Sequence, residues 1–234
     1  MPEDPVKELR QLVVSLTQWL NYQRRLGRLG EPKEPGPRSQ EQAPVINLFP
    51  NLTEIRAELG DCRRCKLSAR RTHIVFGDGP PRASLMFIGE GPGEEEDLQG
   101  LPFVGAAGQL LNKLLNKLGL KREEVYIANV VKCRPLGNRD PEADEITACL
   151  PFLKKQIKAI RPQAIVTLGR VATQALLDTQ TPLTRLRGQW QRYRQIPVMP
   201  TFHPSYLLRF PKERHKTWED MQRVMELLAA HEEI

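Results

Sequence analysis

The sequence predicts an α/β domain whose central sheet is parallel and covered by helices on both faces. Two observations lead to this fold class. Four short segments are apolar along nearly their whole length, at residues 84–88, 125–131, 164–168 and 196–202. Segments with apolar residues at helical spacing separate these four. Apolar strands that alternate with helices are typical of parallel sheets buried on both sides.

An extension and a linker are predicted ahead of this domain. Apolar residues at helical spacing predict a helix over about 5–29, within an N-terminal helical extension of residues 1–30. Residues 31–50 contain five prolines and predict an extended linker. The α/β domain then occupies residues 51–234. The extension either packs on the domain or offers a helix to a protein partner.

Four helices are predicted between and after the strands, over residues 107–118, 140–160, 171–177 and 217–230. The first is rich in leucine on one side and ends at Gly119. Asp140 and Pro141 suit the N-cap and first position of the second helix. Pro151 is expected to kink that helix.

Composition and charge indicate a soluble protein with an anionic partner. Apolar residues make up 40% and charged residues 27% of the chain, which is ordinary for a globular protein. No apolar run is long enough to span a membrane, and the N-terminus lacks the features of a signal peptide, so a cytoplasmic location is expected. The net charge of +7 favours nucleic acid as the partner; the alternative is simply a basic surface.

The four cysteines predict a metal site. Cys62 and Cys65 form a C-x-x-C pair, and Cys133 and Cys149 follow far downstream. Such a set in a cytoplasmic protein does not suggest disulfides. Spacing alone leaves zinc and an iron–sulfur cluster as alternatives, with four unrelated buried thiols as the third.

The segment 89–105 follows the first predicted strand and combines three glycines with an acidic run. It is not a dinucleotide fingerprint, because the third glycine comes one residue early. Glu90 and its acidic neighbours suit activation of a water or stabilisation of a cationic transition state, unless the run is only a solvated loop. Phe103 is expected either to stack on a base or to lie in the core.

Two further segments follow later strands. Asn129 interrupts an apolar strand, and its amide either bonds to backbone or pairs with the edge of a base. In the segment 203–209, His203 could stabilise negative charge on a base carbonyl, and Leu207 to Arg209 could wedge into a duplex. The alternative for this segment is an ordinary helix start, with Leu207 and Leu208 in the core.

These segments are expected to meet, because parallel sheets place their sites beyond the carboxyl ends of the strands. Together they resemble the iron–sulfur branch, type 4, of the uracil-DNA glycosylase superfamily. The matching stretches are CRRC at 62–65, GEGPGEEED at 89–97, LPFVGAAG at 101–108, ANVVKCRP at 128–135, the spacing to Cys149, and HPSYLLR at 203–209. They cover nearly all of residues 52–231.

The resemblance implies a three-layer α/β/α fold with a central four-stranded parallel sheet. It implies a [4Fe–4S] cluster on Cys62, Cys65, Cys133 and Cys149, which settles the metal that spacing left open. It also implies a monofunctional DNA-repair enzyme that flips deoxyuridine out of single- or double-stranded DNA and hydrolyses its N-glycosidic bond, leaving an abasic site.

Residue roles follow from the same resemblance. Its implied catalytic residues are Glu90, Glu96 and His203. The residues that it implies for uracil binding are Gly91, Phe103, Asn129 and Asn138, and those for DNA contact are Ser205, Leu207, Leu208 and Arg209. A monomer in the nucleoid-associated cytoplasm is expected, with no membrane partner.

Residues 1–50 depart from the family pattern, so the resemblance says nothing about them. Gly105 to Gly108 run straight into the leucine-rich helix, without the basic, histidine-containing insertion of a covalently trapping relative. Turnover by hydrolysis is therefore expected. The rival functions are a DNA-binding module shaped by a cluster and an iron–sulfur redox protein.

Overall fold

The computed structural model describes residues 13–20, 22–23 and 51–232. The chain divides into two units, Met1–Ile46 and Asn47–Ile234. In the first unit, residues 13–20 and 22–23 are helical, and several of their apolar side chains, Trp19 among them, are exposed. The predicted linker and the rest of the predicted N-terminal helix lie outside the described residues.

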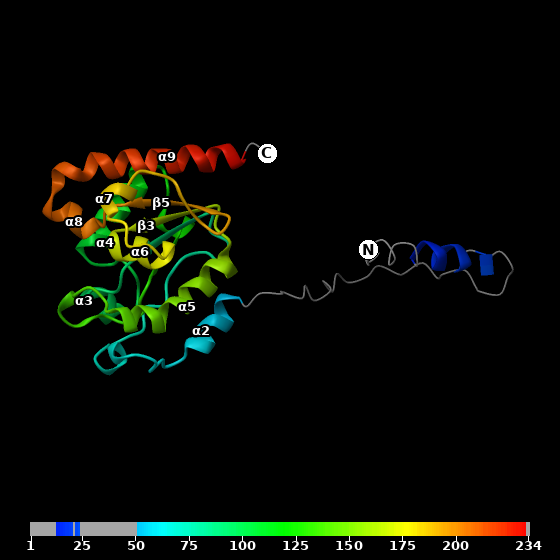
Figure 1. The fold of residues 1–234 in the computed structure, drawn as a ribbon, viewed down its shortest axis with the longest axis horizontal. Coiled ribbons are helices and arrows are strands. Elements are labelled where there is room, and N and C mark those ends of the chain that lie inside the picture. Colours follow the sequence, from blue (N-terminus) through cyan, green and yellow to red (C-terminus); the bar gives the residue numbers. More distant parts are fainter. Residues whose placement is uncertain (1–12, 21, 24–50, 233–234) are drawn as a thin grey trace. The chain divides into compact units, whose positions relative to one another are not determined.

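The second unit is built on one five-stranded sheet with the order β2-β1-β3-β5-β4. Its strands are β1 Leu85–Gly89, β2 Tyr126–Asn129, β3 Ala164–Leu168, β4 Gln191–Tyr193 and β5 Ile196–Thr201. Strands β3 and β5 are labelled in Figure 1. The four predicted strands pair in parallel, as expected. Strand β4 joins the edge antiparallel to β5 and was not predicted, because its three residues form no apolar run.

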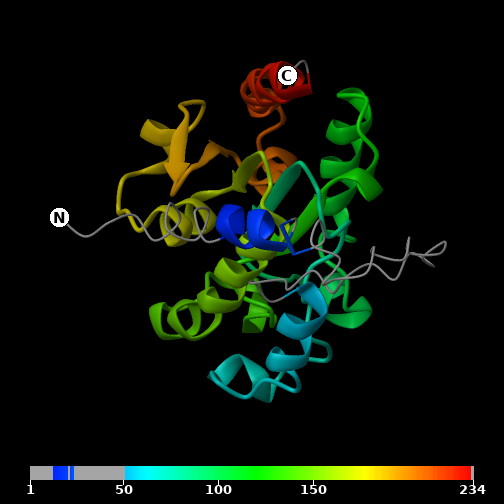
Figure 2. The same ribbon diagram turned by 90° about the vertical axis from the view of Figure 1, so that its right-hand side faces the viewer.

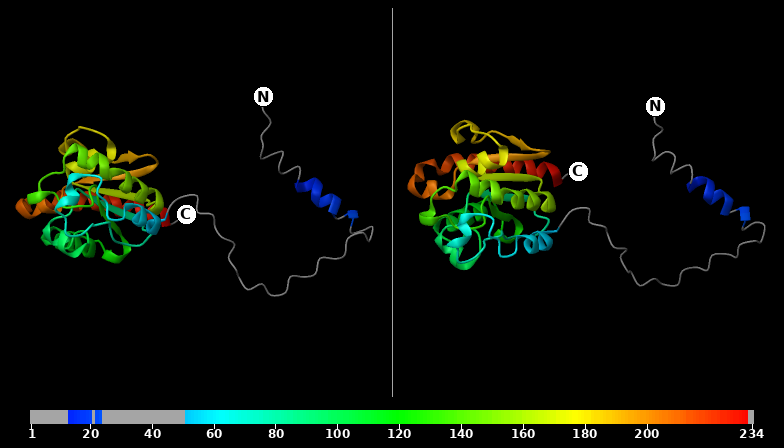
Figure 3. Two further views of the ribbon diagram at one scale, coloured as in Figure 1. Left: turned by 90° about the horizontal axis from the view of Figure 1, so that it is seen from below. Right: turned by 60° about the horizontal axis from the view of Figure 1, so that its bottom comes forward.

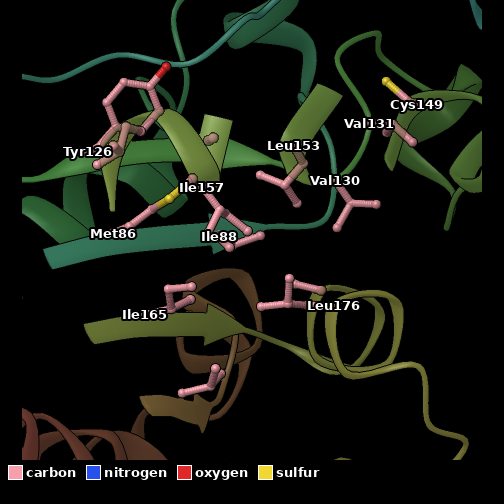
Figure 4. Close-up of a cluster of buried hydrophobic side chains, with 14 of the residues drawn as sticks. Met86, Ile88, Tyr126, Val130, Val131, Cys149, Leu153, Ile157, Ile165 and Leu176 are labelled. Atoms are coloured by element: carbon pink, nitrogen blue, oxygen red, sulfur yellow. The ribbon is translucent and has the colours of Figure 1, made fainter. Parts of the chain in front are cut away.

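Helices cover both faces of the sheet, which confirms the three-layer α/β/α fold (Figures 1 and 2). On one face, α5 Ala143–Ile160 and α6 Arg170–Leu177 pack against Met86 and Ile88 (Figure 4). On the other face, α4 Ala106–Lys117 and α9 Arg214–Glu232 pack against Phe87 and its neighbours. Alternate residues of β1 therefore enter different cores, as the two-residue period of a strand requires.

Shorter elements complete the domain. The remaining α-helices are α2 Leu52–Leu59, α3 Glu94–Gln99, α7 Leu183–Leu186 and α8 Pro204–Arg209. The 3₁₀ turns are Lys66–Ala69, Arg122–Glu124, Leu136–Asn138 and Pro211–Glu213. Helix α2 starts in a capping box between Asn51 and Glu54, and it packs on Phe152 of α5.

The start of α5 differs from the prediction. Glu142, not Asp140, is the N-cap, and the helix runs from Ala143 through Pro151 as one element. The buried carboxylate of Glu145 accepts the Glu142 N–H at 2.7 Å, while Asp140 pairs with Arg170. Glu142 is therefore the N-cap, because its backbone N–H has an acceptor in Glu145, three residues further along the chain.

None of the helices among the described residues is long and apolar enough to cross a membrane. The carboxyl ends of β1, β2, β3 and β5 point the same way, because these strands are parallel. Helices α3 and α8 lie at one end of the domain in Figure 1 and keep that place in Figure 3.

Candidate active site

A cavity of about 850 Å³ opens at the carboxyl ends of the parallel strands. Segments that follow β1, β2, β3 and β5 all contribute to its lining, which is the convergence that the sequence predicts. The predicted site residues in the lining are Glu90, Gly91, Glu96, Phe103, Asn129, Asn138, His203, Ser205 and Arg209. Asp140 and Arg170 line it as well, and sequence reasoning missed both.

Asn129 and Phe103 line the floor of the cavity, and Gly89 lies directly against both. Gly89 pairs with Asn129 across β1 and β2. A Cβ atom at Gly89 would lie 2.4 Å from Asn129 Oδ1 and 2.6 Å from Phe103 Cζ. Only a residue without a side chain lets the amide and the ring approach this strand so closely.

Asn129 carries an unpaired polar atom at the bottom of the cavity. Its side chain belongs to a residue that is 1% exposed, and Oδ1 is buried without a hydrogen-bond partner among the described residues. A buried acceptor without a donor costs about 1–3 kcal/mol. Such an atom at the end of a strand, inside a cavity, is suited to a ligand N–H.

Phe103 is held in a left-handed backbone conformation, with φ of 52°. Arg122 fixes it by donating to Phe103 O at 3.2 Å and to Pro102 O. Gly108 allows the turn, because a Cβ there would lie 1.8 Å from Phe103 O. The ring lies 5.6 Å from that of His203, centroid to centroid. Strained backbone of this kind is common at functional sites.

Glu96 joins two loops of the site. Its buried carboxylate accepts N–H groups from Gly93 at 3.1 Å, Val104 at 2.8 Å and Gly105 at 2.9 Å. The glycine-rich turn after β1 and the segment that carries Phe103 are therefore tied to one side chain. This arrangement suits Glu96 for positioning these loops.

His203 is a neutral imidazole in this site. Burial lowers its pKa to about 4, with the nearby charge of Arg209 acting in the same direction and Glu96 opposing. The ring Nδ1 accepts the Ser205 N–H at 3.1 Å and lies 2.7 Å from Ser205 Oγ. Because Nδ1 is an acceptor, the ring proton is on Nε2.

Glu90 titrates near neutrality. Burial raises its pKa to about 7, and the negative charge and hydrogen bond of Asp140 add to this shift, while Arg170 opposes it. Asp140 is itself ion-paired with Arg170 at the start of α6. A carboxyl group with such a pKa can gain and lose a proton at working pH.

Asn138 is exposed and has a left-handed backbone, with φ of 55°. Its Oδ1 accepts a hydrogen bond from Arg134 Nε at 2.8 Å. Gly91 lies in the turn next to Glu90 and lines the same cavity.

The predicted DNA-contact residues divide between surface and core. Ser205 and Arg209 line the cavity, and Leu208 is 40% exposed. Leu207 is only 4% exposed, so in this structure it lies in the core, which is the alternative that the sequence left open; its entry into a duplex stays a prediction. The segment forms helix α8, whose successive side chains point in different directions, and Leu207 faces inward.

The four cysteines line a second, smaller cavity together and are not disulfide-bonded. N–H groups face three of the sulfurs. Arg64 Nη1 lies 3.2 Å from Cys62 Sγ, Arg71 Nη1 lies 3.5 Å from Cys133 Sγ, and the Lys132 backbone N–H donates to Cys149 Sγ at 3.3 Å.

The cysteines do not converge as ligands of a single ion would. Across residues 13–20, 22–23 and 51–232, no group of three His, Cys, Asp or Glu side chains could hold one metal ion. Burial raises the pKa of the Cys133 thiol to about 11, against the opposing charge of Arg71.

Comparison with known proteins gives a consistent result. The model of the uracil DNA glycosylase superfamily matches residues 76–227. A type-4 uracil-DNA glycosylase of Sulfurisphaera tokodaii is 47% identical over 186 residues, 76% of this chain and 84% of that protein. One from Thermotoga maritima is 48% identical over 163 residues, 68% of this chain and 84% of that protein. A type-5 uracil-DNA glycosylase of Pyrobaculum aerophilum is 30% identical over 175 residues, 68% of this chain and 77% of that protein.

Proposed function

We propose how this chain, which belongs to the uracil-DNA glycosylase superfamily, recognises and excises its base. The family model and the type-4 relatives make it a uracil-DNA glycosylase, a hydrolase of base excision repair that acts on DNA. The observation that carries the proposed site is the unpaired Oδ1 of Asn129 at the floor of the cavity.

Asn129 recognises uracil in this proposal. Oδ1 accepts the N3–H of the base, and the amide nitrogen donates to O4. Uracil presents this donor and acceptor side by side, so one amide matches both. Binding relieves the cost of the buried unpaired acceptor, whereas a base edge without an N–H leaves that cost in place. The ring of Phe103 stacks on the face of the base, and Arg122 holds the backbone of Phe103 in place.

His203 stabilises the leaving group. When the N-glycosidic bond breaks, negative charge develops on the uracil ring and its O2. A neutral imidazole that presents Nε2–H can donate a hydrogen bond to that oxygen without a proton transfer. Ser205 holds the required tautomer through Nδ1. Burial of the ring strengthens this interaction, because water competes less.

Glu90 activates the water. With a pKa of about 7, the carboxylate can accept a proton from a water that attacks C1′ of the sugar. Its negative charge also stabilises the cationic character of the sugar in the transition state. Glu96 takes no direct part in the chemistry. It positions the two loops, because its oxygens accept three backbone N–H groups. No lysine of the described residues lines the cavity, so we infer hydrolysis by water without cleavage of the strand.

DNA is held around the cavity. Flipping a nucleotide out of a duplex costs a few kcal/mol and needs a residue to occupy the space left in the stack. Leu208 and Arg209 are the exposed residues at the end of α8 that suit this role. The net charge of +7 supplies the attraction to phosphates.

The four cysteines fit a [4Fe–4S] cluster. All four line one cavity, and N–H donors face three of the sulfurs, as thiolates require. When bound, a cluster of this kind supplies strong cross-links between its ligands and electron-transfer capacity. Here the ligands come from the segment after α2, the segment after β2, and α5, so Cys62, Cys65, Cys133 and Cys149 would join three parts of the fold.

Excision from a uracil-containing oligonucleotide tests the proposed site. Asn129→Ala should lower kcat/KM by on the order of 100-fold, because both hydrogen bonds to the base edge are lost. Asn116→Ala, on the exposed face of α4, is the matched control and should retain wild-type activity. Full activity of Asn129→Ala would contradict the proposed recognition. Strand breaks that form without alkali would show that the enzyme also cleaves the DNA strand, and would contradict the proposed hydrolysis of the N-glycosidic bond only.

A further inference from the structure

Lys132 is a buried lysine between the two sites. It directly precedes Cys133 and is 1% exposed, and no other lysine of the described residues is buried. Burying an ammonium group is costly unless it is paired and hydrogen-bonded. The proposed function gives this residue no role, so its position needs an explanation.

The ammonium group makes two short hydrogen bonds. It donates to Asn129 O at 2.8 Å and to Gln156 Oε1 at 2.7 Å. Gln156 is fixed in turn, because its amide donates to Phe76 O at 2.9 Å and to the Tyr126 hydroxyl at 3.1 Å. Lys132 is therefore held rigidly, and it holds the backbone at the end of β2 where the Asn129 side chain enters the cavity.

No carboxylate of the described residues balances the charge of Lys132. Lys132 lines the same small cavity as the four cysteines, and the Cys149 sulfur accepts the Lys132 backbone N–H at 3.3 Å. Cysteine ligands bind metal as thiolates. The thiolates of a bound cluster would therefore supply the missing counter-charge.

We propose that Lys132 couples the two sites: its charge is the buried counter-charge of the cysteine thiolates, and its ammonium group holds Asn129 in place for uracil. The inference rests on the proposed cluster and on the proposed role of Asn129. It makes Lys132 a positioning residue, since it touches neither the base nor the sugar. It also gives the cluster a physical connection to base recognition through the three residues between Asn129 and Cys133.

Lys66 is the matched control, because it directly follows Cys65 just as Lys132 directly precedes Cys133. Its side chain is half exposed and is ion-paired with Glu142 and Asp144. Lys66 has its own counter-charges and does not reach the active-site cavity. A general effect of any positive charge near the cysteines would appear in both lysines, whereas the proposed coupling appears only in Lys132.

The test compares Lys132→Met, Lys132→Gln and Lys66→Met with the wild-type protein. For each purified protein, iron, acid-labile sulfide, cluster reduction potential and dissociation constant for free uracil are measured. Lys132→Met removes a positive charge and should shift the reduction potential to a more negative value. It should also weaken uracil binding by about tenfold, because the hydrogen bond from the ammonium group to Asn129 O is lost. Lys132→Gln should keep the shifted potential but recover most of the uracil affinity, because its amide still donates a hydrogen bond. Lys66→Met should change neither quantity.

Each contrary result has a separate meaning. A wild-type protein without iron and sulfide overturns the proposed cluster and the counter-charge together. If the wild type contains iron but Lys132→Met and Lys132→Gln have the same reduction potential as the wild type, the counter-charge alone is overturned. Unchanged uracil affinity in Lys132→Met overturns the link to Asn129. If Lys132→Met does not fold, Lys132→Gln decides: a wild-type potential in that variant overturns the counter-charge.

Discussion

At the scale of single residues, Glu90 determines how excision depends on pH. As the proposed base it works deprotonated, so kcat/KM should rise with pH through about 7, the pKa that burial and Asp140 give it. Asp140→Asn removes a like charge and should move this rise to lower pH. Arg170→Gln removes an opposite charge and should move it to higher pH.

The other ionisable groups in the cavity lining are Glu94, Glu95, Glu96, Arg139, Tyr206, Arg209 and His203. His203 is neutral above about pH 4 because burial lowers its pKa, so it does not contribute to the rise near 7. Rate–pH profiles of the wild type, both variants and Glu90→Gln check the assignment. A rise that persists in Glu90→Gln would assign it to another group.

A side chain at Gly89 would intrude on the two residues that are proposed to bind the base. In Gly89→Ala the new Cβ would overlap Asn129 Oδ1 at 2.4 Å and the Phe103 ring. We expect uracil binding to be lost and the free energy of unfolding to fall by about 1–3 kcal/mol, the usual cost of overpacking. Uracil affinity and urea unfolding measure the two effects. Wild-type affinity would show that the floor of the cavity does not bind the base.

At the scale of elements, the start of α5 depends on Glu145. Its buried carboxylate caps Glu142 N at 2.7 Å and accepts hydrogen bonds from Arg139 at 2.7 and 2.9 Å. Glu145→Ala should lower the free energy of unfolding by about 1–2 kcal/mol, as loss of a cap does. Asp144→Ala, exposed in the same turn, is the control and should cost less.

The cap also has a pH dependence. The pKa of Glu145 is lowered, chiefly by its hydrogen bonds with Arg139. A carboxyl group whose folded pKa is depressed contributes stability above its unfolded pKa and loses it as pH falls through the folded pKa. The difference in unfolding free energy between wild type and Glu145→Ala should therefore be largest near neutrality and shrink in acid. A difference that is constant with pH would contradict the ionised cap.

The elements also show where sequence patterns succeed. β3 has the predicted bounds, and β1, β5, α4 and α6 differ by about one residue, because apolar runs and helical spacing extend over whole elements. Strand β4 and helices α2, α3 and α7 were missed. Strand β4 is short and half-exposed, and α3 is an acidic segment whose helical form depends on Gly93 and Glu96.

At the scale of the whole molecule, net charge and surface position govern DNA binding. Affinity should fall steeply with salt, because binding of phosphates releases counterions. Arg209→Gln, at the cavity, should reduce the slope of log K against log salt by about 1. Arg192→Gln removes the same charge from the edge strand β4 and should leave the slope unchanged. Equal changes in both variants would indicate only a diffuse basic surface.

The sequence by itself determined the α/β class, the order of the main elements and the set of residues that would meet at the strand ends. It could do so because strand and helix periods, glycine turns and cysteine spacing are local properties of the chain. The core position of Leu207, the clamp of Arg122 on Phe103, the pairing of Asp140 with Arg170 and the burial of Lys132 came only from the tertiary structure. Each depends on which side chains from distant segments face one another after packing, because burial and missing counter-charges are properties of the folded surroundings and not of a residue's neighbours in sequence.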